Sequence, residues 1–290
     1  MNLKSSCLIL LSINSLSASA EVTLDGSLGG GGALKGPDYF IGADLGRQHG
    51  GNLFHSFQGF NLNHSESATF SGPNSVSNII SRVTGGNPSN IDGLIRSTIP
   101  NADMYFLNPY GIMFGPNARL DVQGSFHAST ADYLRLGDDG RFDARNLNDS
   151  ILTIAPIEAF GFLTDTPTAI TTQDSTLSVF EGKTLSLIGG DLDINSDSAV
   201  MINKPSFIAL PNQPKLSSPS GKINLISAAS KGEVVSDEFG FLLSAKGGQI
   251  TINNNLIEVN GIAGGQIDIQ GGKLIMRDSF SFPRAGVGMP

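Results

Sequence analysis

The stretch Asn108–Asp132, NPYGIMFGPNARLDVQGSFHASTAD, decides the fold of this chain. Its first four residues, NPYG, predict a turn, because proline presets φ at the second position and glycine at the fourth tolerates backbone angles that side chains resist. GPN at 115–117 and the glycine at 124 predict two further reversals. The stretch therefore alternates turns with short segments.

Between these turns, apolar and polar residues alternate, as they do in strands that bury one face. The apolar positions are Ile112, Phe114, Ala118, Leu120, Val122, Phe126 and Ala128. Only about two to four residues separate the segments, too few for a crossover helix. A series of hairpins and a coil that stacks on itself both fit this spacing.

A glycine corner followed by a short alternating strand recurs in the second half of the chain. The copies are GKINL at 221–225, GGQITI at 247–252 and GGQIDI at 264–269, and the last two lie 17 residues apart. Repetition at about one coil's length is typical of a parallel β-helix, whose equivalent strands stack ~4.8 Å apart. The sequence therefore predicts an all-β parallel β-helix, with about 20 residues per coil and roughly ten coils.

The composition agrees with many tight turns and few salt-bridged helices. Charged residues make up only 15% of the 290 residues, glycine occurs 36 times and tryptophan is absent. The length suits one solenoid domain, because a solenoid core grows lengthwise rather than outward.

The first twenty residues have the three-part order of a signal peptide. Lys4 supplies a positive charge, CLILLSI at 7–13 is apolar, and ASA at 18–20 has the form of a cleavage site. We expect cleavage after Ala20 and export; the alternative is a wrongly chosen start codon before a cytosolic domain. No later run approaches the roughly 18 apolar residues that span a bilayer, so we expect no membrane insertion.

Cysteine and charge narrow the possible partners and compartments. Cys7 is the only cysteine and lies in the segment to be removed, so core packing and ladder hydrogen bonds must hold the mature chain together. After residue 20 the chain has 17 basic and 26 acidic residues, a net of −9. This balance disfavours nucleic acid and anionic membrane surfaces as partners.

The chain after residue 20 is interpreted as one domain, with a cap at about 21–75, coils at about 76–280 and an irregular tail at 281–290. The aromatic segment 52–62, NLFHSFQGFNL, could act as a lid on the first coil. The charged segment 134–149 is predicted to be a surface loop. Residues 154–163 are predicted to form a flap on the outside of the body, and the proline-rich residues 203–220 a loop.

Five blocks resemble the N-terminal secretion domain of filamentous-haemagglutinin-type exoproteins, especially its cyanobacterial branch. They are NLFHSFQGFNL, ISRVTGGNPSNIDG, NPYGIMFGPNARLDVQGSFHASTADYLRL, LSLIGGDLDI and GGQIDIQGGKLIM. The resemblance runs from about Val22 to Asp278, and the central block is specific.

This resemblance implies a right-handed parallel β-helix with an N-terminal cap and extra-helical elements. It also implies two-partner secretion, in which a dedicated outer-membrane transporter recognises the domain through its periplasmic POTRA modules. We therefore expect a secreted, monomeric, non-enzymatic adhesin-type chain without a cofactor, which contacts ligands or glycans on host or neighbouring cells. Full-length relatives carry many further repeats, so we interpret this chain as a truncated or frameshifted member.

The family's Asn-Pro-x-Gly turn maps onto Asn108, Pro109 and Gly111, with Tyr110 where Asn is usual. The companion Asn-Pro-Asn-Leu turn has no clear match, and its nearest counterpart is Asn87-Pro88. These residues either only build corners, or help to register the first coils or to contact the transporter. Both interpretations stay open.

The alternative function is a β-helix enzyme that acts on acidic polysaccharides. Asp191 and Asp193 flank an inward Leu192 and would lie about 7 Å apart on the outer face, near the carboxylate spacing of an inverting glycosidase. No Arg or Lys cluster and no aromatic sugar platform accompany them, so solvated aspartates are the favoured interpretation. A third possibility is a surface-layer or matrix protein without a dedicated transporter.

Two further patterns resemble sites but lack the necessary residues. Residues 191–197 (DLDINSD) match the start of a calcium loop, yet Ser196 replaces the glycine and Ile202 the glutamate that such loops need. Ser125 and His127 suggest a nucleophile and a base only superficially, because no third group is evident to orient them. His49, His55 and His64 are scattered, and we predict neither a metal nor a catalytic site.

Overall fold

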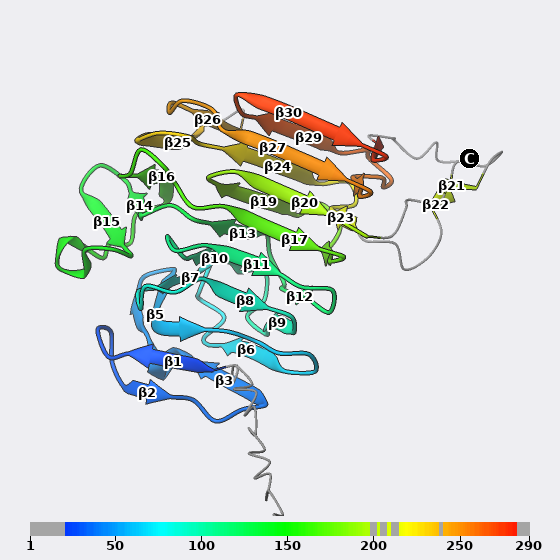
Figure 1. Ribbon diagram of the computed structural model, residues 1–290. Coiled ribbons are helices and arrows are strands. Elements are labelled where there is room, and N and C mark those ends of the chain that lie inside the picture. The colour runs from blue at the N-terminus through cyan, green and yellow to red at the C-terminus, as the bar shows by residue number, and fades with distance from the viewer. Residues whose placement is uncertain (1–20, 198–201, 204–207, 210–214, 238–239, 283–290) are drawn as a thin grey trace, which may run out of the picture.

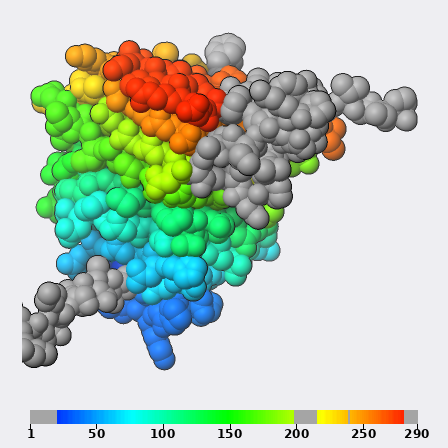
Figure 2. Space-filling view, turned by 45° about the vertical axis from the view of Figure 1, so that its right-hand side comes forward, coloured from blue at the N-terminus to red at the C-terminus, as the bar shows by residue number. Residues whose placement is uncertain are grey.

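The computed structural model describes residues 21–197, 202–203, 208–209, 215–237 and 240–282. The predicted signal peptide with Cys7, its cleavage site after Ala20, and most of the tail at 281–290 lie outside the described residues. Across the described part the chain forms a stack of flattened coils, and Figure 2 shows the colours following one another in bands from one end to the other.

Sheet A runs the length of the molecule and contains ten strands (Figure 1). In spatial order they are β2 (Gly31–Ala33), β1 (Val22–Asp25), β5 (Asn52–Phe60), β7 (Asn78–Val83), β10 (Asp103–Leu107), β13 (Phe126–Ser129), β19 (Thr184–Gly189), β24 (Lys222–Ser227) and β29 (Gln266–Gln270), with β4 (Arg47–His49) beside β5. The pairs from β5 to β29 are parallel, whereas β1, β2 and β4 pair antiparallel.

Two further faces close each coil, and their strands also pair in parallel. Sheet C contains β8 (Ser89–Ile91), β11 (Ile112–Phe114), β17 (Ile170–Gln173), β20 (Leu192–Asn195), β27 (Gln249–Asn253) and β30 (Lys273–Arg277). On the third face, sheet B contains β3 (Asp38–Gly42), β6 (Ser67–Ser71), β9 (Leu94–Ser97) and β12 (Arg119–Asp121), and sheet E contains β18 (Thr176–Ser178), β23 (Lys215–Ser217), β28 (Leu256–Glu258) and β31 (Phe280–Phe282). The predicted all-β parallel β-helix is confirmed.

The stretch at 108–132 forms one turn of this coil rather than a series of hairpins. Its three strands, β11, β12 and β13, lie in sheets C, B and A respectively. Phe114 and Phe126 point into the coil, where their ring centroids lie 6.4 Å apart. Glycine and proline corners separate strands of only three or four residues, so each strand occupies one face before the chain turns.

The predicted number of coils is wrong. Within the described residues, seven strands of sheet A, from β5 to β29, stack in parallel. Successive coils are longer than 20 residues: bonded side chains on neighbouring coils lie 26 residues apart at Asn52 and Asn78, and 38 apart at Ser186 and Asn224. Loops inserted at the corners therefore make each coil longer than the estimated 20 residues, so the chain forms fewer coils than predicted.

The two glycine cassettes that lie 17 residues apart are also not equivalent strands of successive coils. Ile250 lies in sheet C and pairs with Leu192, whereas Ile267 lies in sheet A and pairs with Ile223. A coil with three faces places a glycine corner and a short alternating strand at more than one face. The 17-residue spacing therefore spans two of the three faces, from sheet C past β28 of sheet E to sheet A.

Residues 134–149, which were predicted to be a surface loop, contain two strands with buried side chains. Sheet D consists of β15 (Gly140–Asp143), β14 (Tyr133–Leu136), β16 (Ile157–Phe162), β25 (Gly232–Asp237) and β26 (Gly240–Leu243), all antiparallel. Leu134, Leu136 and Phe142 are fully buried. The prediction failed because the hairpin packs against sheet A side chains such as Phe54 and Ile80, which lie far away in the sequence. The predicted flap at 154–163 is confirmed, since β16 buries Phe160 and Phe162.

Half of the predicted loop at 203–220 lies outside the described residues, and β23 within the described half is a regular strand of sheet E. The remaining elements are two short 3-10 helices and one two-stranded sheet. They are η1 (Ala43–Leu45), η2 (Leu147–Asp149), β21 (Ile202–Asn203) and β22 (Ile208–Ala209).

The structure contains two hydrophobic cores that share sheet A. The first fills the coil interior and includes inward residues such as Phe106 and Leu187. The second lies between the outer face of sheet A and sheet D, and includes Ile80, Phe160 and Ile188. Sheet A is therefore buried on both faces. Its strands accordingly carry apolar residues on both faces, as Leu185–Ile188 does.

The aromatic segment at 52–62, which was predicted to be a lid, forms a strand between the antiparallel strands at the end of the solenoid and the parallel coils. Its strand β5 pairs antiparallel with β1 and β4 on one side and parallel with β7 on the other. Phe57 and Phe60 lie in the coil interior, and the Phe60 ring lies 4.9 Å from Phe106 on a later coil. The antiparallel strands cover an edge that would otherwise expose unpaired backbone groups.

Candidate functional site

The Asn108–Gly111 turn connects sheet A to sheet C and is held from inside by the Asn108 side chain. Its Oδ1 accepts the Tyr110 backbone N–H at 2.9 Å, and the Gly111 N–H donates to the Asn108 carbonyl at 3.1 Å. Gly111 has a φ of 118°, a conformation that favours glycine. Asparagine side chains commonly accept from a backbone N–H two residues on, which is why this residue type starts the turn.

The structure brings the two candidate turns together on neighbouring coils. Asn108 Nδ2 donates to the Asn87 carbonyl and to Ser89 Oγ, each at 3.0 Å. The Ser89 N–H donates to the Gly111 carbonyl at 3.0 Å. Asn87-Pro88 therefore precedes β8 just as Asn108–Gly111 precedes β11, one coil later. The sequence pointed to both turns separately but gave no sign that they touch.

The two turns differ in exposure, and this separates their possible roles. Asn108 and Pro109 are buried, Tyr110 is half-buried, and Asn87 and Pro88 are exposed. A partner could touch Asn87, Pro88 and the Tyr110 ring but not the Asn108 side chain. Asn108 thus builds the corner, and its neighbours form the accessible surface.

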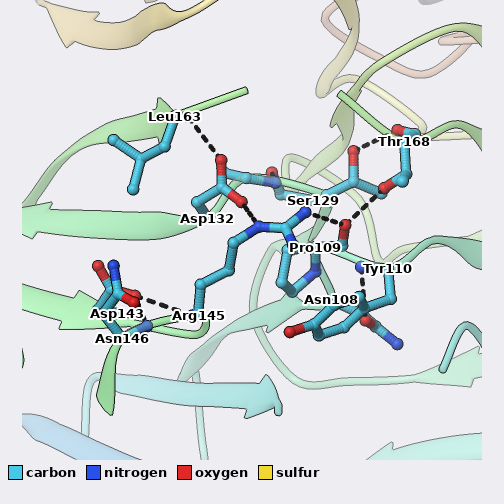
Figure 3. Close-up of polar contacts among 12 residues, drawn as sticks. Asn108, Pro109, Tyr110, Ser129, Asp132, Asp143, Arg145, Asn146, Leu163 and Thr168 are labelled. Atoms are coloured by element: carbon cyan, nitrogen blue, oxygen red, sulfur yellow. Dashed lines mark hydrogen bonds and ion pairs between the residues drawn. The ribbon is translucent and has the colours of Figure 1, made fainter. Parts of the chain in front are cut away.

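The base of sheet D closes over the outer side of the same turn (Figure 3). The Pro109 carbonyl accepts from Arg145 Nη2 at 3.0 Å and from Thr168 Oγ1 at 2.8 Å. Arg145 Nε also donates to the buried Asp132 carboxylate, which accepts the Leu163 N–H at 2.5 Å. Sequence reasoning missed this cluster because residue 145 lies in the segment predicted to be a surface loop.

A second buried cluster surrounds Arg82 on β7, which is only 1% exposed. Its Nε donates to Ser56 Oγ at 2.8 Å, and its Nη1 to Ser150 Oγ at 2.8 Å and to the Asp143 carbonyl. Nη2 donates to Ser27 Oγ at 3.0 Å. One guanidinium thereby joins the first strands, two coils and the hairpin of sheet D.

The charges around Arg82 are balanced within the cluster. Burial lowers the pKa of Arg82 to about 10, against the opposing effect of the carboxylates of Asp25 and Asp143. Burial alone would raise the pKa of Asp25, but hydrogen bonds from Ser56, Ser27 and Thr84 outweigh it and lower that pKa. Both groups therefore remain charged at neutral pH, and the cluster has the character of a structural junction.

Ser125 and His127 do not form a nucleophile and base. The Ser125 hydroxyl accepts the Thr184 N–H at 3.2 Å, whereas His127 Nδ1 lies 2.9 Å from Ser186 Oγ on the next coil. The His127 ring stacks on Tyr105 with centroids 4.5 Å apart, beneath sheet D. Burial lowers the pKa of His127 to about 4, although Asp103 opposes this effect.

The other histidines lie apart from one another. His55 is fully buried beside Phe57 and Phe70, and burial lowers its pKa to about 4. His49 lies on β4 and His64 on an exposed turn. Within the described residues, no group of three or more His, Cys, Asp or Glu side chains is suited to a metal ion.

Asp191 and Asp193 do not form a pair of free carboxylates. Asp191 lies at a corner, where its Oδ1 accepts the Gln249 N–H of the next coil at 2.9 Å. Asp193 lies on the outer face of β20, and the calcium-loop residue Asp197 donates its N–H to Asp174 Oδ1 at 3.0 Å. Residues 191–197 are therefore strand β20 with the two corners that flank it, stacked between neighbouring coils. The described part of the chain has no helix of the length and apolarity that a membrane crossing needs.

This chain is similar to several known proteins. A solved structure, the HMW1 secretion domain from Haemophilus influenzae, aligns over 92% of this chain and 82% of that chain, with a TM-score of 0.32 and 16% identity. A heme/hemopexin-binding protein of Haemophilus influenzae is 33% identical over 81 residues, which are 28% of this chain and only 8% of that protein. Residues 20–273 match the family model described as the TPS secretion domain. Because this match spans most of the chain, the protein belongs to the TPS, or two-partner secretion, domain family.

Proposed function

We propose that this domain directs its chain to a dedicated outer-membrane transporter and nucleates folding of the β-helix after export. The observation that carries the proposal is the family match over residues 20–273. The transporter would recognise the domain through periplasmic POTRA modules, and the domain would have no enzymatic activity of its own.

The arrangement of the coils supports the folding role. β1, β2 and β4 cover the first parallel strand, and each later strand of sheet A pairs with the strand of the preceding coil. Because a solenoid repeat contacts mainly its neighbours, folding can spread from a capped end along the chain. The first coils, from β5 to β13, contain no long insertion, so a chain that emerges N-terminus first would meet a growing template.

The corner formed by Asn87-Pro88 and Asn108–Gly111 is the element we propose for recognition. It joins three successive coils through Asn108, whose backbone N–H donates to the Ser129 carbonyl at 2.9 Å and whose side chain reaches the Asn87 carbonyl. The exposed Asn87 and Pro88, together with Tyr110, would contact the transporter before export, and the Asn108 bonds would register the coils once the chain folds outside. The two roles left open by the sequence, register and recognition, are compatible in this geometry.

Export, location and adhesion belong to the same proposal. A signal peptide at residues 1–20 would bring the chain to the periplasm, and the transporter would deliver it to the cell surface or the medium. The monomeric product would contribute to a haemagglutinin- or adhesin-type protein that contacts surface ligands or glycans. Binding of the secreted chain to cells, and its loss after glycan removal, would test the adhesive part.

The recognition role is tested by export of variants in a diderm bacterium that carries a matched transporter. Asn108→Ala should strongly reduce the secreted fraction, because it removes hydrogen bonds to Asn87, Ser89 and Tyr110. Asn117→Ala is the matched control: it lies in a neighbouring corner and loses a comparable bond to Asp92 of 3.0 Å. Unchanged export of Asn108→Ala, or equal losses in both variants, would refute a specific role for this turn.

The same cultures also test the alternative function, cleavage of an acidic polysaccharide. Asp193→Asn should leave export unchanged, and no variant should alter the viscosity or reducing ends of an acidic polysaccharide. Polysaccharide cleavage by the wild-type chain that disappears in Asp193→Asn would establish the alternative function instead.

A further inference from the structure

Three corners of the solenoid share one contact between successive coils. In each, the Oδ1 atom of an aspartate on the earlier coil accepts a backbone N–H of the next coil. The pairs are Asp92 with Asn117, Asp103 with Ser125 and Asp191 with Gln249, at 2.8, 2.7 and 2.9 Å. The strands beside these corners pair in parallel, β8 with β11, β10 with β13 and β20 with β27. The same contact therefore recurs along the stack.

A glycine of the later coil receives each carboxylate. It lies one or two residues before the donating amide, at Gly115, Gly124 and Gly248. A Cβ atom at these positions would lie 2.5, 2.5 and 3.0 Å, respectively, from Oδ1 of the aspartate. At 2.5 Å a side chain would displace the carboxylate. Each aspartate is thus complementary to a glycine and an amide that follow on the next coil.

The first corner excludes a slipped register more strictly than the third. A shift of the later coil by one residue would place Phe114 or Pro116 against the Asp92 carboxylate. At the third corner Gly247 precedes Gly248, so one slipped register still brings a glycine to the carboxylate. Because a one-residue slip also turns every side chain of a strand to the other face, the register must be fixed before the core can pack.

The first two contacts also join residues that lie close together in the chain. Asp103 and Ser125 are 22 residues apart, and the pair at Asp92 is separated by 25 residues. The pair at Asp191 spans 58 residues, because β25 and β26 of sheet D lie before β27. Closing a shorter loop costs less conformational entropy, so the first two contacts can form earlier during folding.

We propose that Asp92 and Asp103 set the register of the first coils while the chain folds after export. This role rests on the folding part of the proposed function and deepens it. Each carboxylate is a charged acceptor on a coil that has already formed, and carboxylates bind backbone N–H groups strongly. The next coil docks where a glycine and an amide reach the carboxylate together. The backbone amide of Asn117 is the recognised group, so its side chain is not required for this step.

The test measures refolding and unfolding rates of the purified chain in urea by circular dichroism. Asp92→Ala and Asp103→Ala should each slow refolding about tenfold, the effect of losing a hydrogen bond to a charged group, and change the unfolding rate less than about threefold. Asp191→Ala should mainly speed unfolding, because its contact forms later. Asp193→Ala is the control: it removes an aspartate from the outer face of β20 and should change neither rate.

A double-mutant cycle tests the complementarity of aspartate and glycine. The three atoms nearest to a Cβ at Gly115 all belong to the Asp92 side chain. Gly115→Ala should therefore slow refolding about tenfold in the wild-type background, but about threefold or less in the Asp92→Ala background. Equal slowing in both backgrounds would overturn the proposal.

The proposal would also be overturned if Asp92→Ala and Asp103→Ala refolded within about twofold of the wild-type rate and only unfolded faster. Such rates would make these aspartates stabilising contacts of the finished coil. If the alanine variants do not fold, Asp103→Asn decides: it keeps an uncharged acceptor and should refold about threefold slower than wild type, and a wild-type rate would overturn the proposal. These rates are measured without the transporter, so export that is independent of the transporter would refute the targeting function separately.

Discussion

The two sides of sheet A are both buried, yet they are built in different ways. The coil interior is filled mainly by a continuous cluster of aliphatic and aromatic side chains. The space beneath sheet D also buries Arg82, His127, Asp132 and Asp143. Buried charges need partners, and here those partners come from several segments at once.

The difference lies in how far apart in the sequence the contacting residues are. In the interior, neighbouring coils stack residues such as Leu53 and Ile79, or Met104 and Phe126, at the register of one coil. Beneath and within sheet D, the bond from Tyr133 to Glu233 spans 100 residues and that from Arg82 to the Asp143 carbonyl spans 61. The interior can therefore form coil by coil, whereas the outer layer needs distant segments to be in place.

The largest expected effect comes from removing the charge at the centre of the outer layer. Arg82→Ala should lower the free energy of unfolding by about 3–5 kcal/mol, because it removes the donor to the buried Ser56 hydroxyl and Asp143 carbonyl and the positive charge near Asp25. Urea unfolding followed by circular dichroism measures the change. A loss below about 1 kcal/mol would mean that this cluster contributes no more than a surface ion pair.

Truncation of two adjacent residues of β19 compares the packing of the two layers directly. Leu187 points into the coil and Ile188 toward sheet D, and both are fully buried. Leu187→Ala and Ile188→Ala should each cost about 2–5 kcal/mol, as truncations in packed cores do. If Ile188→Ala cost less than about 0.5 kcal/mol, as exposed positions usually do, sheet D would not be packed on the coil in solution.

Each layer also contains one buried histidine, which gives the stability a pH dependence. Burial lowers the pKa values of His55, in the interior, and His127, in the outer layer, to about 4, below the ordinary value of about 6.5. As the pH falls from about 6.5 to about 4, the unfolded chain binds protons that the folded chain rejects. Stability should therefore fall in this window, by up to roughly 3 kcal/mol per histidine, and should not change from this cause above about pH 7.

Single replacements assign this pH dependence to a layer. His127→Gln should remove the contribution of the outer layer, and His55→Gln that of the interior, in unfolding curves recorded between pH 4 and 8. A wild-type profile that is flat over this window would show that neither ring is held neutral.

The smallest expected effect belongs to an ion pair outside both layers. Arg96 and Asp121 pair at 2.7 Å on the outer face of sheet B, with 44% and 36% of their side chains exposed. Arg96→Ala should change the free energy of unfolding by no more than about 1 kcal/mol, and less at high salt. A larger loss would show that sheet B supports the coil through more than its inward residues.

The same contrast explains what the sequence could predict. Alternation at Ile112–Phe114 and Phe126–Ala128, together with the turns between them, was sufficient to predict short strands, because those signals are local. The recurring glycine cassettes in the second half of the chain were needed to favour a coil over hairpins. The hairpin at Tyr133–Asp143 has equally regular alternation, but its charged outer residues suggested a loop. Its burial depends on sheet A side chains such as Phe54 and Ile80, much earlier in the chain.

The residues of the candidate site also differ in whether the sequence alone could identify them. The proline and glycine of the Asn108–Gly111 turn follow from turn chemistry, and the importance of Asn87-Pro88 came only from a family resemblance. Their contact requires knowledge of the coil length, which the glycine cassettes misjudged. Arg145 and Asp132 could not be found from spacing, since nothing in the sequence relates them to Pro109.

The measurement that tests the central claim most directly is secretion of residues 1–290 from a diderm bacterium with and without a matched two-partner transporter. Circular dichroism of the product would report its fold. A β-rich protein in the medium only when the transporter is present is the expected result. Equal export without the transporter, or retention in the periplasm despite it, would contradict the targeting role.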